Sequence, residues 1–120
     1  MMFRLLKRRR AIKKFVCQLP LELHRRFGAK RFYSLKEIDR AIEHGDLDRA
    51  FIAFAHALFS SREEFDSYYG QLKLGCTYDG LRKHVSKRFF CGTLDFDASS
   101  ILQFAKRSDG DEFYESHLAE

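Results

Sequence analysis

The sequence predicts an all-α protein, a compact single-domain bundle of six to seven short helices. Apolar residues recur at spacings of three and four through most of the chain, as they do along one face of a helix. Residues 50–59 carry no charge and only one polar side chain, His56, so a helix there belongs in a core. One Pro and 7 Gly are few for a protein of many tight turns. Since 120 residues can bury a sizeable core, we expect residues 1–120 to form one domain, with its helical body over 20–120.

Residues 1–19 are expected to form a basic amphipathic helix. Leu5, Ile12 and Val16 lie on one face of this helix, and Lys and Arg occupy most of the other faces. Consecutive basic residues at 7–10 interrupt the apolar run that a secretory signal needs. No stretch of the chain reaches the roughly 18–20 apolar residues that span a bilayer. We therefore expect no transmembrane segment and a cytoplasmic protein.

Two shorter helices are predicted next along the chain. Pro20 suits the first turn of a helix, and Gly28 suits the position just after its last turn. Ser34 and Glu37 have the spacing of a capping box, in which each side chain bonds the backbone N–H of the other residue. The helix that starts there is expected to stop at Gly45.

The segment 46–60 is predicted to be the central helix of the bundle. Asp46 is expected to cap its first turn, because an Asp side chain can accept a hydrogen bond from a free backbone N–H there. Phe51, Phe54 and Leu58 share one narrow stripe of this helix. We therefore expect these three side chains at the centre of the core.

Three further helix starts are predicted in the second half of the chain. Ser61 and Glu64 repeat the capping-box spacing. Asp79 is expected to cap a second basic helix, and Asp97 a final short one. Residues 112–120 are expected to form an acidic helical turn or a loose tail.

The charge of the chain is unevenly distributed. Residues 1–31 hold eleven Lys and Arg against one acid, Glu22, a balance of +10. Residues 32–120 hold eleven Lys and Arg against sixteen acids, a balance of −5. Such asymmetry indicates an anionic partner for the basic part. The alternative is that the basic helix docks on the acidic surface of its own body.

We expect a non-catalytic binding protein whose basic N-terminal arm contacts an anionic partner. Nucleic acid is the first candidate partner, and an anionic membrane surface or an acidic protein is the second. Cations stand directly before aromatic residues at 25–27, 30–33 and 87–90, a pairing that suits single-stranded nucleic acid, although each Phe can instead be the last inward residue of its helix. The predicted anion-binding residues are Arg4, Lys7, Arg8, Arg9, Arg10, Lys13, Lys14, Arg25, Arg26, Lys30 and Arg31. The alternative function is a protein-docking or peripheral membrane-surface module that uses the apolar face of the first helix.

A catalytic function is the hypothesis that this sequence favours least. The three Cys, at 17, 76 and 91, are odd in number and widely spaced, which favours reduced thiols over a disulfide framework. Cys76, His84 and Cys91 are the candidates for a metal or thiol site, but they lack the close spacing of typical metal ligands. No phosphate-binding glycine loop or nucleophile elbow occurs. We therefore expect no metal and no cofactor, keep a small Cys/His enzyme as an alternative, and expect His56 to be a hydrogen-bonded, half-buried histidine.

Overall fold

The computed structural model describes residues 2–72, 75 and 77–108, and every regular element in that part of the chain is a helix. Seven α-helices occur in these residues, and a short 3-10 helix, η1, comes directly before α4. Their bounds are α1 Met2–Cys17, α2 Leu19–Phe27, α3 Leu35–His44, η1 Arg49–Phe51, α4 Ile52–Phe59, α5 Arg62–Leu72, α6 Tyr78–Phe89 and α7 Ala98–Ser108. The predicted all-α bundle of six to seven short helices is confirmed. The predicted segment 112–120 lies outside the described residues.

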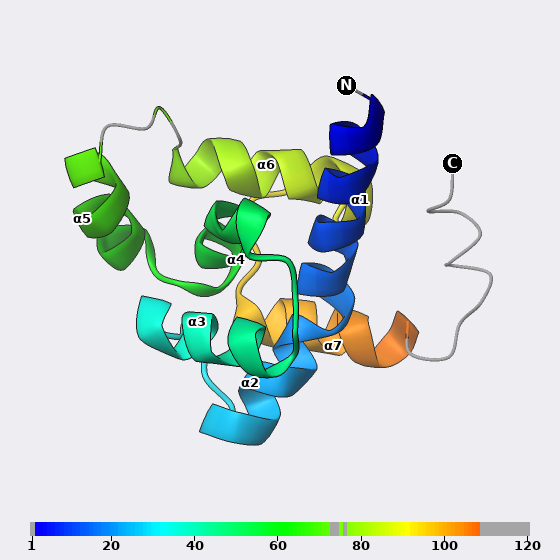
Figure 1. Ribbon diagram of the computed structural model, residues 1–120. Helices are drawn as coiled ribbons and strands as arrows, with labels where there is room; N and C mark the ends of the chain where they lie inside the picture. Colours follow the sequence, from blue (N-terminus) through cyan, green and yellow to red (C-terminus); the bar gives the residue numbers. More distant parts are fainter. Residues whose placement is uncertain (1, 73–74, 76, 109–120) are drawn as a thin grey trace.

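Helix α4 lies in the middle of the molecule with other helices around it (Figure 1). It packs against α6, whereas α1 packs against α7 and α2. Helix α5 lies at the opposite side of the molecule from α1 (Figure 1). The first turns of α1 extend past α6, so the N-terminal part of this helix projects from the body.

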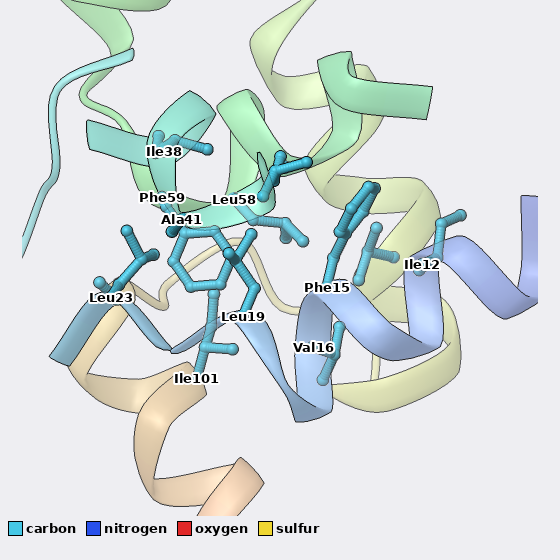
Figure 2. Packing of buried hydrophobic residues seen from close by; sticks show 14 of the residues in the cluster. Ile12, Phe15, Val16, Leu19, Leu23, Ile38, Ala41, Leu58, Phe59 and Ile101 are labelled. Carbon is cyan, nitrogen blue, oxygen red and sulfur yellow. The ribbon is translucent and has the colours of Figure 1, made fainter. Parts of the chain in front are cut away.

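Most of the largest buried side chains come from α1, α2, α3, α4, α6 and α7 and meet in one cluster (Figure 2). Phe65 of α5 lies instead in a second, smaller cluster with Ala57, Tyr69 and Tyr78. Phe15 and Phe59 are fully buried in the first cluster, and Leu58 is buried as predicted. Phe51 and Phe54 are only partly buried against the first cluster, so their predicted place at its centre is wrong. Burying a large aromatic side chain contributes most where no water remains around it, which makes Phe15 and Phe59 the central rings of this core.

The start of the central helix explains that difference. Asp46 does not cap it, because its backbone adopts φ 54°, outside the helical region. Asp48 instead accepts a hydrogen bond from the Ala50 N–H at 2.9 Å and opens η1. The α-helix therefore begins only at Ile52, and Phe51 and Phe54 lie at its less protected end.

The predicted helix start at Ser34 is confirmed. The Ser34 hydroxyl accepts from the Glu37 N–H at 3.1 Å, and the Glu37 carboxylate accepts from the Ser34 N–H at 2.9 Å. At α5, the Ser61 hydroxyl accepts from the Glu64 N–H, but the Glu64 carboxylate accepts from the Leu35 N–H instead, at 2.9 Å. That second bond ties the first turn of α5 to the first turn of α3, because a free N–H at a helix start needs an acceptor.

The two remaining predicted caps have different outcomes. Asp97 accepts from the Ser100 N–H at 3.1 Å and caps α7 as expected. Asp79 does not cap α6, because Thr77 stands at the cap position and its hydroxyl accepts from the Gly80 N–H at 3.0 Å. Asp79 lies within the first turn of that helix, where an acid is favourable near the positive end of the helix dipole.

Helix α6 also buries a charged side chain, Arg82, which the sequence pattern does not predict. Arg82 is buried and donates hydrogen bonds to the carbonyl oxygens of Ala57, at 3.0 Å, and Phe96. Its guanidinium lies over the rings of Tyr78 and Phe96, 4.9 and 3.9 Å from their centroids. Burial lowers the pKa of Arg82 from its ordinary value. This side chain fixes the segment before α7 against α4 and α6.

Candidate anion-binding site

A pocket of about 430 Å³ lies between α1 and α6. Both helices contribute basic side chains to it. The lining residues are Arg8, Arg9 and Ile12 from α1, with His84, Val85, Lys87 and Arg88 from α6. No acidic side chain is among these described residues, so the charges that they contribute to the pocket are all positive.

Helical spacing brings these side chains together on each wall. Arg8 and Ile12 are four residues apart on α1, and His84 and Arg88 are four residues apart on α6, so each pair shares one helix face. Ile12 and Val85 are buried and provide an apolar floor. The same contacts that attach α1 to the body therefore place its basic residues opposite those of α6.

The electrostatics of the pocket act on His84. Burial, and then the positive charges of Arg8, Lys87 and Arg88, lower the pKa of the His84 imidazole. The ring centroid of His84 lies 5.4 Å from that of Phe54 on α4, so the two rings are in contact. The imidazole is therefore more easily neutral here than in water, and a bound anion would reverse that preference.

Arg8 carries an unsatisfied donor at this site. Its Nε atom is shielded from solvent and has no hydrogen-bond partner in the described part of the chain. A buried donor without an acceptor costs free energy, and this cost is greater for a charged group. An anion drawn between Arg8 and the cations of α6 would supply acceptor oxygens to a guanidinium, whose fork of N–H groups fits carboxylate and phosphate.

Two of the seven predicted cations of the first helix line this pocket, and the other five do not. Arg8 and Arg9 line it, whereas Arg4, Lys7, Arg10 and Lys14 are exposed and Lys13 is half-buried. Within the described residues, Arg4, Arg8, Arg10 and Lys14 form no ion pair. The positive charge of these four side chains is therefore available to a partner.

The other four predicted cations meet acids of the chain itself. Arg25 and Arg26 meet Glu22, the latter at 2.8 Å, Lys30 meets Glu37 at 2.7 Å, and Arg31 meets Asp97 at 3.0 Å. The hydrogen bond from Arg26 is the main cause that lowers the pKa of Glu22. Within residues 1–31, this arrangement separates an unpaired group on α1 from a group that is paired intramolecularly.

The apolar face of the first helix is buried along one part of the helix and exposed along the other. Ile12 and Val16 are buried in the body, whereas Leu5 and Leu6 are 49% and 44% exposed. The helix is therefore neither wholly docked nor wholly free. Its C-terminal half belongs to the core, and its N-terminal turns present both apolar and basic side chains.

Sequence reasoning omitted the α6 wall from the site. The sequence presents Lys87 and Arg88 as cations before aromatic residues, and His84 as a candidate for a metal or thiol site with Cys76 and Cys91. Phe89 is buried in the core, as expected for the last inward residue of a helix, so it offers no ring to a ligand. The three basic side chains share helical spacing, but that α6 lies opposite α1 depends on packing between distant segments.

The thiol and histidine candidates do not form a second site in the described residues. Cys76 lies outside them, and Cys91 is exposed in the turn after α6. No group of three or more His, Cys, Asp or Glu side chains that could hold a metal ion occurs among the residues described.

His56 is more buried than expected. Its ring lies 2.6 Å from both the Tyr69 hydroxyl and the Asp39 carboxylate, linking α3, α4 and α5.

None of the described helices combines the length and apolar character that crossing a membrane requires.

No curated protein and no solved structure matches the chain. One family model does, over residues 2–117. With nearly the whole sequence covered, the chain belongs to a family of unknown function, DUF6559.

Proposed function

We propose that this protein binds the phosphate backbone of nucleic acid. The contact surface consists of α1 and the side of α6 that lines the pocket. The single observation that carries the proposal is the convergence of Arg8 and Arg9 with Lys87 and Arg88 around a pocket with no acid among its described lining residues. Phosphates are the anions that such clusters of Arg and Lys bind in nucleic-acid-binding proteins.

The distribution of ion pairs supports the placement of this surface. Cations at 25, 26, 30 and 31 already have carboxylates of the chain beside them. Arg4, Arg8, Arg10 and Lys14 have none within the part of the chain described. An incoming phosphate competes with an existing carboxylate in the first group and meets no competitor in the second, so α1 should contribute most of the binding free energy.

The mode of contact follows from the burial of the aromatic residues. Phe89 is buried, whereas Phe32, with the Arg31 guanidinium 5.5 Å from its ring centroid, is 41% exposed. No Phe or Tyr is among the described residues that line the pocket, and exposed Phe32 lies outside that lining. We infer contacts to phosphates, with little discrimination among base sequences.

Two triple variants with the same loss of charge test this proposal. Arg8, Arg9 and Arg10 are changed to Gln in one, and Arg25, Arg26 and Arg31 in the other. Binding to a labelled 20-nucleotide single strand is measured by fluorescence anisotropy at low salt, with circular dichroism confirming the fold. We expect the first variant to lose about tenfold or more in affinity and the second about threefold or less. The reason is that Arg8 and Arg10 have no carboxylate partner among the described residues, whereas Arg25, Arg26 and Arg31 each have one. Equal losses would mean that net charge alone governs binding, which would contradict the proposed surface.

A second candidate function rests on Leu5 and Leu6. These exposed apolar side chains stand among Arg4, Lys7 and Arg9 on the projecting turns of α1, a composition that suits the surface of an anionic membrane. Binding to vesicles containing phosphatidylserine separates the two functions. Changing Leu5 and Leu6 to Ser should abolish vesicle binding and leave nucleic-acid binding intact, since phosphate contacts use the cations only.

A further inference from the structure

We propose that the pocket between α1 and α6 binds a terminal phosphate monoester, the group at the 5′ end of a nucleic-acid strand. This inference rests on the proposed function and specifies what that surface recognises. Arg8, His84, Lys87 and Arg88 would surround the phosphate, and Ile12 and Val85 would contact the adjoining sugar.

The charge of the pocket favours a monoester over a diester. A phosphodiester within a strand carries one negative charge, whereas a monoester carries about −1.5 to −2 near neutral pH and offers three strong acceptor oxygens. The lining has four permanent cations and one titratable imidazole, with no carboxylate among these residues. More negative charge is therefore compensated per ligand when the ligand is a chain end.

The shape of the pocket favours a chain end for a separate reason. Its lining comes from α1 and α6 and includes two buried apolar side chains, Ile12 and Val85. A phosphate within a strand offers two non-bridging oxygens to the lining, whereas a terminal phosphate offers three. A terminal phosphate can enter, and the volume of about 430 Å³ exceeds what a phosphate alone requires, leaving room for the first sugar.

The unsatisfied Nε of Arg8 is the independent observation that indicates a ligand. This donor is shielded from solvent and has no partner in the described residues. With its guanidinium turned toward the pocket, Arg8 would donate from Nε and one Nη in parallel to two phosphate oxygens, the paired geometry that Arg forms with phosphate. Binding would then remove an unfavourable feature of the free protein as well as add contacts.

His84 faces the same position. Lys87 and Arg88 on its own helix and Arg8 on α1 are the charged groups around it, and Phe54 on α4 lies against its ring. The second proton of a phosphate monoester titrates near pH 6, close to the ordinary range of histidine. The dianion would favour the protonated imidazole, which adds one more donor to the phosphate.

Four ligands and four single variants test the proposal. The ligands are a 3′-labelled 20-nucleotide strand with a 5′-phosphate, the same strand with a 5′-hydroxyl, and adenosine 5′-monophosphate compared with adenosine. Arg8→Gln and Lys87→Gln remove cations that line the pocket. Arg10→Gln and Lys83→Gln remove exposed cations from the same two helices that do not line it, so they are matched controls for charge.

The strand with the 5′-phosphate should bind about tenfold more tightly than the strand with the 5′-hydroxyl, the lower end of what charge-assisted hydrogen bonds contribute. Arg8→Gln and Lys87→Gln should remove this preference, and Arg10→Gln and Lys83→Gln should retain it. Equal binding of the two strands by the wild-type protein would overturn the pocket proposal and leave the proposed function standing. A preference that survives both pocket variants would overturn it too, and Lys87, being exposed, keeps this test valid if Arg8→Gln does not fold.

Failure of the proposed function has a different signature. If neither strand binds at low salt, nucleic-acid binding is contradicted. Binding of adenosine 5′-monophosphate then tests whether the pocket holds a phosphate monoester. Chemical-shift changes at His84 and its neighbours with adenosine 5′-monophosphate but not adenosine would support a monoester site for free nucleotides. No change with either would overturn the pocket proposal.

Discussion

Arg8 on α1 and His84 on α6 line the same pocket, and burial followed by the charge of Arg8 lowers the pKa of the His84 imidazole. Two side chains from distant parts of the sequence thus lie close together, and the charge of Arg8 disfavours the protonated His84 imidazole. Lys87 and Arg88 act on the imidazole in the same direction. The fold holds like charges close together here, which costs stability unless an anion is present.

The lowered pKa of His84 predicts how stability depends on pH. Below the ordinary histidine pKa of 6.5, the unfolded chain takes up a proton that folded His84 resists, so His84 lowers stability as pH falls through this range until its own folded pKa is reached. His84→Gln should therefore make the urea midpoint depend less on pH between about 5 and 7, the range around that pKa. His44→Gln, at the exposed end of α3, is the control. An unchanged pH dependence in His84→Gln would contradict this electrostatic account.

The core predicts a contrast between two phenylalanines of α4. Phe59 is fully buried, and Phe59→Ala should cost about 3–5 kcal/mol, the usual range for such truncations. Phe54 is only partly buried, so Phe54→Ala should cost clearly less, since fewer contacts and less cavity volume are lost. Urea unfolding followed by circular dichroism measures both. A larger cost for Phe54 would place the centre of the core elsewhere.

Arg82 should be more important to stability than any cation of the pocket. Arg82→Met should destabilise by about 2–4 kcal/mol, because the carbonyls of Ala57 and Phe96 would each lose a buried donor at about 1–3 kcal/mol. The neighbouring exposed Lys83→Met is the control and should change stability by about 0.5 kcal/mol or less. Thermal unfolding compares the two. Similar melting temperatures would mean that the Arg82 hydrogen bonds contribute little.

The capping box at α3 predicts a smaller effect. Ser34→Ala removes the oxygen that accepts from the Glu37 N–H and should cost about 0.5–2 kcal/mol. Ser34→Asp keeps an acceptor and should retain most of the stability, because Asp is also a favoured cap residue. Chemical denaturation of both variants gives the comparison. Equal losses in the two would show that the hydroxyl is not acting as a cap.

Local signals allowed much of the helix pattern to be predicted from sequence. The capping box at Ser34, the cap at Asp97 and the Pro20 and Gly28 boundaries depend on neighbouring residues only, and the structure contains each of them. The start of the central helix was misplaced because Asp46 and Asp48 are chemically equivalent as caps. Their difference lies in a backbone conformation that composition does not reveal.

The site was predictable on one side only. The basic residues of α1 were evident from charge density alone. Whether a given Arg is paired depends on tertiary contacts, as Arg31 with Asp97 illustrates. The α6 wall depends on how α1 docks, through Ile12 and Val16, onto the body. Sequence indicated an anionic partner for the whole segment 1–31, and the structure concentrates the unpaired charge on α1.

The salt dependence of nucleic-acid binding is the most direct test of the electrostatic account. Affinity for a single-stranded oligonucleotide is measured from low to moderate salt with the wild-type protein and with Arg8, Arg9 and Arg10 all changed to Gln. If about four to six cations engage phosphates, the slope of log affinity against log salt should lie near −3 to −5, from roughly −0.7 to −0.9 per contact. The triple variant should flatten that slope by about 2–3 units. A wild-type slope near zero, or a slope that the triple variant leaves unchanged, would contradict phosphate binding by this surface.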